Sequence, residues 1–128
     1  MNLPTISVIM PVFNGELFLS KAIESILNQT FHDFELIIVN DGSTDNTKSI
    51  IEKYKVIDKR IIVKNQENKG LTKSLNIALS IAKGKYIARQ DADDISLSVR
   101  FEKQIYWLTN RKYEAVFSRA YYNSKKRI

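Results

Sequence analysis

Short apolar segments rich in β-branched residues alternate with helix-like amphipathic segments along most of this 128-residue chain. Residues 6–12 (ISVIMPV) and 34–40 (FELIIVN) show the first pattern. Between them, Leu19, Ile23 and Ile26 recur at the spacing of one helix face. Strands that alternate with helices are joined by right-handed crossovers, which gives a mostly parallel sheet with helices on both faces. The pattern therefore predicts an α/β fold.

The same alternation continues beyond the second strand. We expect further strands at residues 60–66, 85–90 and 114–118, and further helices around residues 50–54, 71–82 and 101–108. Residues 1–113 are assigned to a single domain, and residues 114–128 to a divergent basic tail.

Composition excludes several classes of protein. Hydrophobic residues make up 44% and charged residues 27% of the chain, which is typical of a globular domain and not of a disordered one. Cysteine is absent, so disulfides and thiolate metal sites are excluded, as suits a cytoplasmic protein. The apolar stretch at residues 6–13 is too short to span a bilayer.

The net charge of +6 is concentrated near the carboxyl end. Arg119, Lys125, Lys126 and Arg127 lie there without an acidic neighbour, while the rest of the chain is close to neutral. No motif for reading nucleic acid accompanies these charges, so no nucleic acid is expected as a partner. The tail is interpreted first as a solvated end, and second as a segment attracted to an anionic membrane surface.

Polar loops follow the four main strands. In open parallel sheets, ligands bind beyond the carboxyl ends of the strands, so these loops are expected to gather at one edge. They are residues 13–15 (FNG), 41–43 (DGS), 68–70 (NKG) and 91–94 (DADD).

Three aspartates, Asp91, Asp93 and Asp94, follow the fourth strand within four residues. Carboxylates this close repel each other unless a cation or a hydrogen-bonded ligand compensates. They are hard oxygen ligands suited to Mg²⁺ or Mn²⁺, and waters and a bound diphosphate would complete such a shell. The alternative is a capping cluster in which Asp94 or Ser96 begins the next helix.

Two other residues at the same edge have a structural and a functional interpretation each. Asp41 would form an Asx turn or a helix cap, or it would accept a hydrogen bond from a nucleobase N–H. Phe13 would belong to the core, or it would border a base pocket. Lys69 lies in a generic turn.

The sequence has no Ser-His-Asp arrangement, no P-loop and no dinucleotide-binding fingerprint.

Three segments carry a resemblance to a known family: SVIMPVFNGELFLSKAIESILNQTFHDFELIIVNDGSTDNT, NKGLTKSLNIAL and GKYIARQDADDIS. Together they closely resemble the amino-terminal, nucleotide-sugar-binding half of family 2 glycosyltransferases, which have the Rossmann-like GT-A fold. The resemblance covers about residues 5–110.

The resemblance implies roles for particular residues. Those implied to hold the uracil of a UDP-sugar, or a related base, are Pro11, Val12, Phe13 and Asp41. The Asp91-Ala92-Asp93 segment matches the DXD motif, in which Asp91 meets the ribose or the metal-bound diphosphate and Asp93 coordinates Mn²⁺ or Mg²⁺. Lys69 and Arg89 are implied to approach the donor. Arg100 and Gln104 match positions of many bacterial members without an assigned role.

The activity implied by the resemblance is inverting sugar transfer from the nucleotide-sugar donor to a hydroxyl of a glycan or lipid-linked saccharide, in polysaccharide or cell-envelope glycan synthesis. The implied location is cytoplasmic and peripheral at the inner face of the membrane. In the family the acceptor-binding half and the general base lie well beyond the DXD segment, so both are expected outside this truncated sequence, and no catalytic residue is assigned. Leu97 or Ser98 replaces a common proline.

Two alternatives remain open. The first is a non-catalytic nucleotide-binding module that acts with a partner chain. The second is another metal-dependent α/β enzyme such as a nucleotidyltransferase, which should show a glycine- and arginine-rich loop after the first strand. The VFNGELF segment does not have that composition.

Overall fold

The structure is a computed structural model that describes residues 2–111 and 113–120. Its strands and helices alternate along the chain: β1 (Ile6–Val12), α1 (Leu19–Leu27), β2 (Phe34–Asp41), α2 (Thr47–Ile57), β3 (Ile61–Gln66), α3 (Leu71–Ile81), β4 (Tyr86–Arg89) and α4 (Arg100–Asn110). The strands form one sheet in the order β3-β2-β1-β4, and every neighbouring pair is parallel. The predicted parallel α/β architecture is confirmed.

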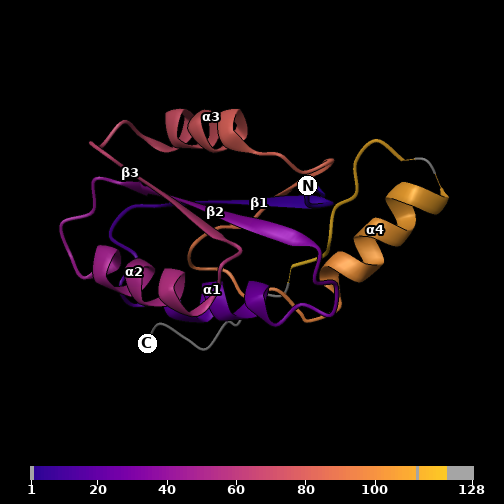
Figure 1. Ribbon diagram of the computed structural model, residues 1–128, viewed down its shortest axis with the longest axis horizontal. Coiled ribbons are helices and arrows are strands. Elements are labelled where there is room, and N and C mark those ends of the chain that lie inside the picture. The colour runs from indigo at the N-terminus through magenta and orange to yellow at the C-terminus, as the bar shows by residue number, and fades with distance from the viewer. Residues whose placement is uncertain (1, 112, 121–128) are drawn as a thin grey trace.

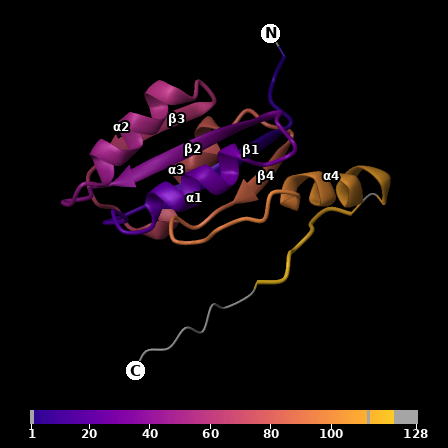
Figure 2. The same ribbon diagram turned by 90° about the horizontal axis from the view of Figure 1, so that it is seen from below.

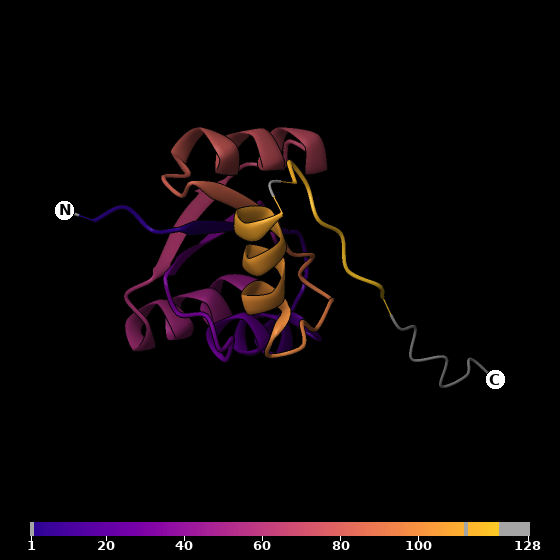
Figure 3. The same ribbon diagram turned by 90° about the vertical axis from the view of Figure 1, so that its right-hand side faces the viewer.

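Helices cover both faces of the sheet, as Figures 1 and 3 show, with α3 on one side and α1 and α2 on the other. The larger core lies on the α1 and α2 side, where Leu19, Ala22, Ile23 and Ile26 of α1 pack on the even-numbered residues of β1. The smaller core joins Ile9, Ile37 and Val39 to Ala78 of α3. Alternation in the strands and helical spacing in the sequence therefore account for both layers.

The chain order reverses between β1 and β4. From β1 the sheet grows through β2 to β3, and the chain then returns to place β4 on the free side of β1. Such a reversal opens a crevice at the carboxyl ends of the two strands involved, which is where ligands bind in doubly wound folds. Strand β4 makes this opening wider because it ends at Arg89, opposite Ile9, while β1 continues to Val12.

A proline inside a central strand is accommodated by the same difference in strand length. The carbonyl of Ile9 accepts a hydrogen bond from the amide of Gln90 at 3.0 Å, so this side of β1 faces β4. Pro11, two residues further, points its backbone nitrogen to the same side, where β4 has already ended. Its missing N–H therefore removes no hydrogen bond from the sheet.

Two expectations about elements differ from the structure. The second helix is longer than residues 50–54, since it begins at Thr47 and ends at Ile57. The strand expected at residues 114–118 is wrong, because this described segment has no regular structure and the side chain of Phe117 is 92% exposed. Among residues 2–111 and 113–120 no neighbouring strand lies there to satisfy its backbone groups, and a lone strand is not stable.

Two other expectations concern the carboxyl end and the membrane. The boundary predicted at residue 113 stays a prediction, and Lys125, Lys126 and Arg127 lie outside the described residues. In the part of the chain that is described, no helix is both long enough and apolar enough to cross a bilayer.

Candidate functional site

The loops after β1 and β2 are joined by hydrogen bonds through one asparagine. The backbone N–H of Asn14 donates to Oγ of Ser43 at 2.9 Å, and Oδ1 of Asn14 accepts from the backbone N–H of Thr44 at 2.8 Å. The next amide, that of Gly15, donates to Oγ1 of Thr47 at 2.8 Å. Asn14 adopts a left-handed backbone with φ of 50°, a conformation that Asn tolerates better than most residues.

The loops after β2 and β3 are joined in turn by Asp41, which is only 4% exposed. Its Oδ1 accepts hydrogen bonds from the side-chain amide of Gln66 at 2.9 Å and from the backbone N–H of Lys69 at 2.7 Å. Its Oδ2 accepts from the backbone N–H of Gly70 at 3.0 Å. Asp41 therefore fixes the segment that leads into α3. It does not cap the helix after Asp45, where the carboxylate of Asp45 itself accepts from the amide of Thr47.

These hydrogen bonds also set the charge of Asp41. Burial by itself raises the pKa of this carboxyl group, but the hydrogen bonds from Gln66, Lys69, Gly70 and Ser74 outweigh burial and hold the pKa below its ordinary value. The group is thus ionised at neutral pH. Hydrogen bonds to the charged form of a carboxyl group favour ionisation, so the network that fixes the turn also keeps Asp41 negative.

A glycine allows the two loops to approach closely. Gly42, directly after Asp41, has φ of 74°, and a Cβ added to it would lie 2.6 Å from the backbone nitrogen of Asn68. Any other residue would therefore meet both backbone strain and a collision with the main chain. The DGS sequence after β2 is explained by this contact.

The residues expected to border a base lie at the same edge. Pro11 and Val12 are buried at the end of β1, while the side chain of Phe13 is 53% exposed directly after them. Asp41 ends the neighbouring strand β2. Phe13 is therefore not a core residue, and its ring is half exposed where β1 ends.

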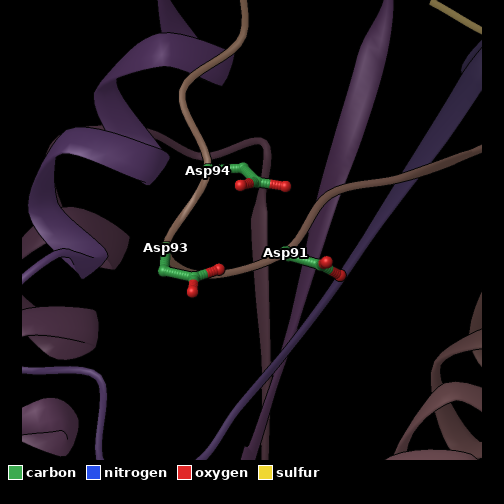
Figure 4. Close-up of side chains that lie close together, drawn as sticks. All are labelled: Asp91, Asp93 and Asp94. Atoms are coloured by element: carbon green, nitrogen blue, oxygen red, sulfur yellow. The ribbon is translucent and has the colours of Figure 1, made fainter. Parts of the chain in front are cut away.

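The three aspartates after β4 lie close together. One carboxylate oxygen from each of Asp91, Asp93 and Asp94 is within 4.8 Å of the others, and the carboxyl groups are exposed. Figure 4 shows that the three side chains extend from the loop to the same side. Burial raises the pKa of Asp94, and repulsion from the other two aspartates raises it further, which Arg100 partly offsets. A hard cation matches this set of oxygen donors.

The loop that carries these aspartates is held by α1 and α4. Among the described residues no hydrogen bond links it to the loops after β1, β2 or β3. Instead, the backbone N–H of Ser96 donates to Oγ of Ser25 at 3.0 Å, and the carbonyl of Ser98 accepts from the amide of Thr30 at 2.8 Å. Neither Asp94 nor Ser96 caps α4, which begins four residues after Ser96.

The two basic residues expected near a donor lie far apart. Nε of Arg89 lies 3.2 Å from Oδ1 of Asp91, in an ion pair whose side chains are both about half exposed. Lys69 follows β3, at the opposite edge of the sheet from β4. The backbone N–H of Lys69 is bound to Asp41 at the end of β2, so two strand spacings, or about 10 Å, separate it from the end of β4. The structure therefore brings Arg89, and not Lys69, beside the acidic loop.

Two surface hollows lie away from the acidic loop. One is between α4 and the segment after it, lined by Trp107, Tyr113, Ala115 and Val116. The other runs along β3 and α3 and includes Gln66 and Lys69. Neither contains the three aspartates, so the candidate site is an open edge of the sheet.

Sequence comparisons give a family. The sequence profile described as Glycosyl transferase family 2 matches residues 7–128. An uncharacterized glycosyltransferase of Methanocaldococcus jannaschii is 47% identical over 126 residues, which cover 95% of this chain and 43% of that protein. An uncharacterized glycosyltransferase of Haemophilus influenzae is 46% identical over 108 residues, covering 84% of this chain and 33% of that protein.

Solved structures give the same fold. Crystal structures of S. aureus TarS 1-349 in complex with UDP and with UDP-GlcNAc superpose with a TM-score of 0.79 at 29% sequence identity. The match covers 84% of this chain and about a third of TarS 1-349. The chain thus spans between a third and somewhat under half of the length of the relatives it matches.

Proposed function

Because the chain belongs to glycosyl transferase family 2 and has its GT-A fold, we propose that the loops after β1, β2 and β4 bind a nucleotide-diphospho-sugar together with Mg²⁺ or Mn²⁺. A UDP-sugar is the proposed donor, in keeping with the UDP and UDP-GlcNAc complexes of TarS. The proposed reaction is inverting transfer to a hydroxyl of a glycan or lipid-linked saccharide. The observation that carries the proposal is the set of three convergent carboxylates beside the chain reversal at β1 and β4.

The order of the strands suggests how the donor lies. Asp41 ends β2, Phe13 follows β1 and Asp91 follows β4, so the three positions succeed one another across the sheet. Two strand spacings, about 10 Å, separate the first position from the last. We assign the base to Phe13 and Asp41, whose carboxylate would accept a hydrogen bond from a base N–H. The diphosphate is assigned to the acidic loop.

The acidic loop supplies the metal ligands. Asp93 and Asp91 would hold the cation, with waters and diphosphate oxygens completing its shell. A bound cation offsets the charge that develops on the leaving nucleoside diphosphate. The residues of this chain hold the base and keep the carboxylates on one side of the loop, so that the donor has one orientation at the edge of the sheet. Deprotonation of the acceptor is assigned to a group outside this sequence.

Titration calorimetry with UDP tests the proposal. UDP should bind more tightly with Mn²⁺ than with EDTA, because the diphosphate otherwise faces the negative charges of Asp91 and Asp93. Asp93→Asn should remove most of the Mn²⁺-dependent increase in affinity and leave the fold intact. The matched control is Asp33→Asn, which removes the same charge at the opposite, amino-terminal end of β2. Equal UDP affinity in Mn²⁺ and EDTA would overturn the metal assignment.

A further inference from the structure

The loop after β4 begins and ends at nearly the same place in the structure. The chain leaves β4 at Arg89, runs along α1 and returns to begin α4 at Arg100, a path that is visible in Figure 2. Arg100 touches the point of departure, because its NH2 group donates to the carbonyl of Arg89 at 3.0 Å. The acidic residues therefore lie on a loop whose two ends are held together by one side chain.

Gln90 fills the inside of this loop and is 3% exposed. Its Nε2 donates to the carbonyls of Asp91 at 3.3 Å and Asp94 at 2.8 Å, which are the two ends of the acidic segment. Its Oε1 accepts from Oγ of Ser96 at 2.7 Å and from NH1 of Arg100 at 2.8 Å. Both donors and both acceptor positions of the amide are used, so this buried group has one arrangement in which it is satisfied.

The guanidinium of Arg100 completes the network. NH1 also donates to Oγ of Ser96 at 2.9 Å, and Nε donates to Oε1 of Gln104 at 3.2 Å. A planar fork with several fixed donors can reach all of these acceptors at once, which an ammonium group on a flexible chain cannot do. Arg100 thus ties the loop to the first turn of α4, and it brings one positive charge to a loop with three aspartates.

We infer that Gln90 and Arg100 are positioning residues for the metal-diphosphate site: they hold the segment from Asp91 to Ser96 in the shape that keeps the carboxylates on one side. The inference rests on the proposed function for its consequence, because a preformed loop loses less conformational entropy when a cation and a diphosphate bind. Residues behind metal ligands commonly change metal affinity by about 10- to 100-fold when they are replaced.

Two substitutions disrupt the network, one at each of its two central residues. Arg100→Lys keeps the positive charge and loses the planar guanidinium with its fixed donors. Gln90→Glu keeps the acceptor for Arg100 and loses the two donors to the loop carbonyls. The matched control is Arg60→Lys. The guanidinium of Arg60 is also partly buried, and it binds Asp58 and the carbonyl of His32 away from the acidic loop.

The first measurement is Mn²⁺ affinity in the presence of UDP, read from the electron paramagnetic resonance signal of free Mn²⁺. Arg100→Lys and Gln90→Glu should each weaken Mn²⁺ about 10-fold or more. Arg60→Lys should lower the melting temperature to a similar degree without changing Mn²⁺ affinity. Wild-type affinity in the folded Arg100→Lys and Gln90→Glu variants would overturn the inference.

The second measurement uses the metal-free protein and does not depend on the proposed function. Hydrogen exchange of the backbone amides of residues 91–97 should be faster in Arg100→Lys than in the wild type or Arg60→Lys. Unchanged exchange would show that the loop is held without Arg100 and would overturn the inference. If the wild-type chain bound neither Mn²⁺ nor UDP, the proposed function would fail, and the exchange rates would still decide whether Arg100 orders the loop.

Discussion

A single residue at this edge of the sheet can combine a structural task with a proposed binding task. Asp41 organises the turn before α3 through hydrogen bonds from Gln66, Lys69 and Gly70. Contact with a nucleobase is its proposed second task. The sequence alone offered these tasks as alternatives, because an aspartate before a glycine is common in turns. Only the distances from Asp41 to Lys69 and Gly70, which are far from it in sequence, show that the turn it forms belongs to another loop.

The first prediction concerns the stability that Asp41 provides. Its folded pKa lies below the ordinary value of 3.8, so the carboxylate stabilises the fold above that pH, and this contribution is lost as the pH falls through the folded pKa. Asp41→Asn should cost about 1–3 kcal/mol at pH 7, because the NH₂ group of the amide would face the backbone N–H of Gly70 or Lys69, which a second donor cannot satisfy. The difference from wild type should shrink at pH 3 in urea unfolding experiments. Glu67→Gln, an exposed change in the same loop, should show no such pH dependence.

The second prediction tests the base contact without disturbing the core. Phe13→Ala should weaken UDP by about 1 kcal/mol, since an aromatic ring beside a base contributes roughly this amount. It should leave Mn²⁺-pyrophosphate binding and the free energy of unfolding unchanged, because Phe13 is half exposed. Phe18→Ala, a similarly exposed aromatic of the same connection, is the control for calorimetry. Equal losses in UDP and pyrophosphate affinity would remove Phe13 from the base site.

The types of the site residues and the ends of the strands could be predicted from the sequence. The hydrogen-bond partners of buried side chains could not. The three aspartates were recognised because they follow an apolar segment within four residues, and the structure places them together. Gln90 was missed, since a glutamine before an acidic run has no distinctive pattern. Arg100 was noted without a role, because its partners are Arg89, Gln90 and Ser96, and no periodicity relates these residues.

At the scale of elements, the loops after β1, β2 and β3 form one connected unit, while the loop after β4 belongs to α1 and α4. Hydrophobic periodicity predicted the four strands and four helices because each buries one face or both. It also predicted a strand at residues 114–118, where apolar residues follow one another without a neighbouring strand. Periodicity reports what a segment could form, and pairing decides what it does form.

The third prediction tests the connection between the loops after β1 and β2. Asn14→Ala loses the hydrogen bonds to Thr44 and also places an alanine at a φ of 50°, whereas Asn14→Gly loses only the hydrogen bonds. Asn14→Ala should therefore be the more destabilising of the two, by about 1 kcal/mol. Chemical denaturation of both variants gives the comparison. A more stable alanine variant would show that backbone strain at this position is unimportant.

At the scale of the whole molecule, the chain is a family 2 glycosyltransferase domain on a four-stranded sheet, and the two relatives described above are more than twice as long. The fourth prediction is that the 128-residue chain binds UDP-sugar in Mn²⁺ without transferring the sugar. Asp41 is bound to backbone amides, and Asp91 and Asp93 are assigned to the metal, so these carboxylates are poor proton acceptors. General-base and proximity effects together can lower a barrier by roughly 10 kcal/mol. Labelled donor with a panel of glycan and lipid-linked acceptors is the assay, and robust transfer would show that the base lies within this sequence.

The position of β4 at the free side of β1 has a consequence for the order of assembly during synthesis. Strands β1, β2 and β3 are neighbours in both chain and sheet, so they can pair while the ribosome is still adding residues. The free side of β1 must wait until Tyr86–Arg89 has emerged. The acidic loop comes later still, and its closure requires Arg100. Until then a newly made chain exposes one unpaired side of β1, the kind of surface on which chaperones act and aggregation begins.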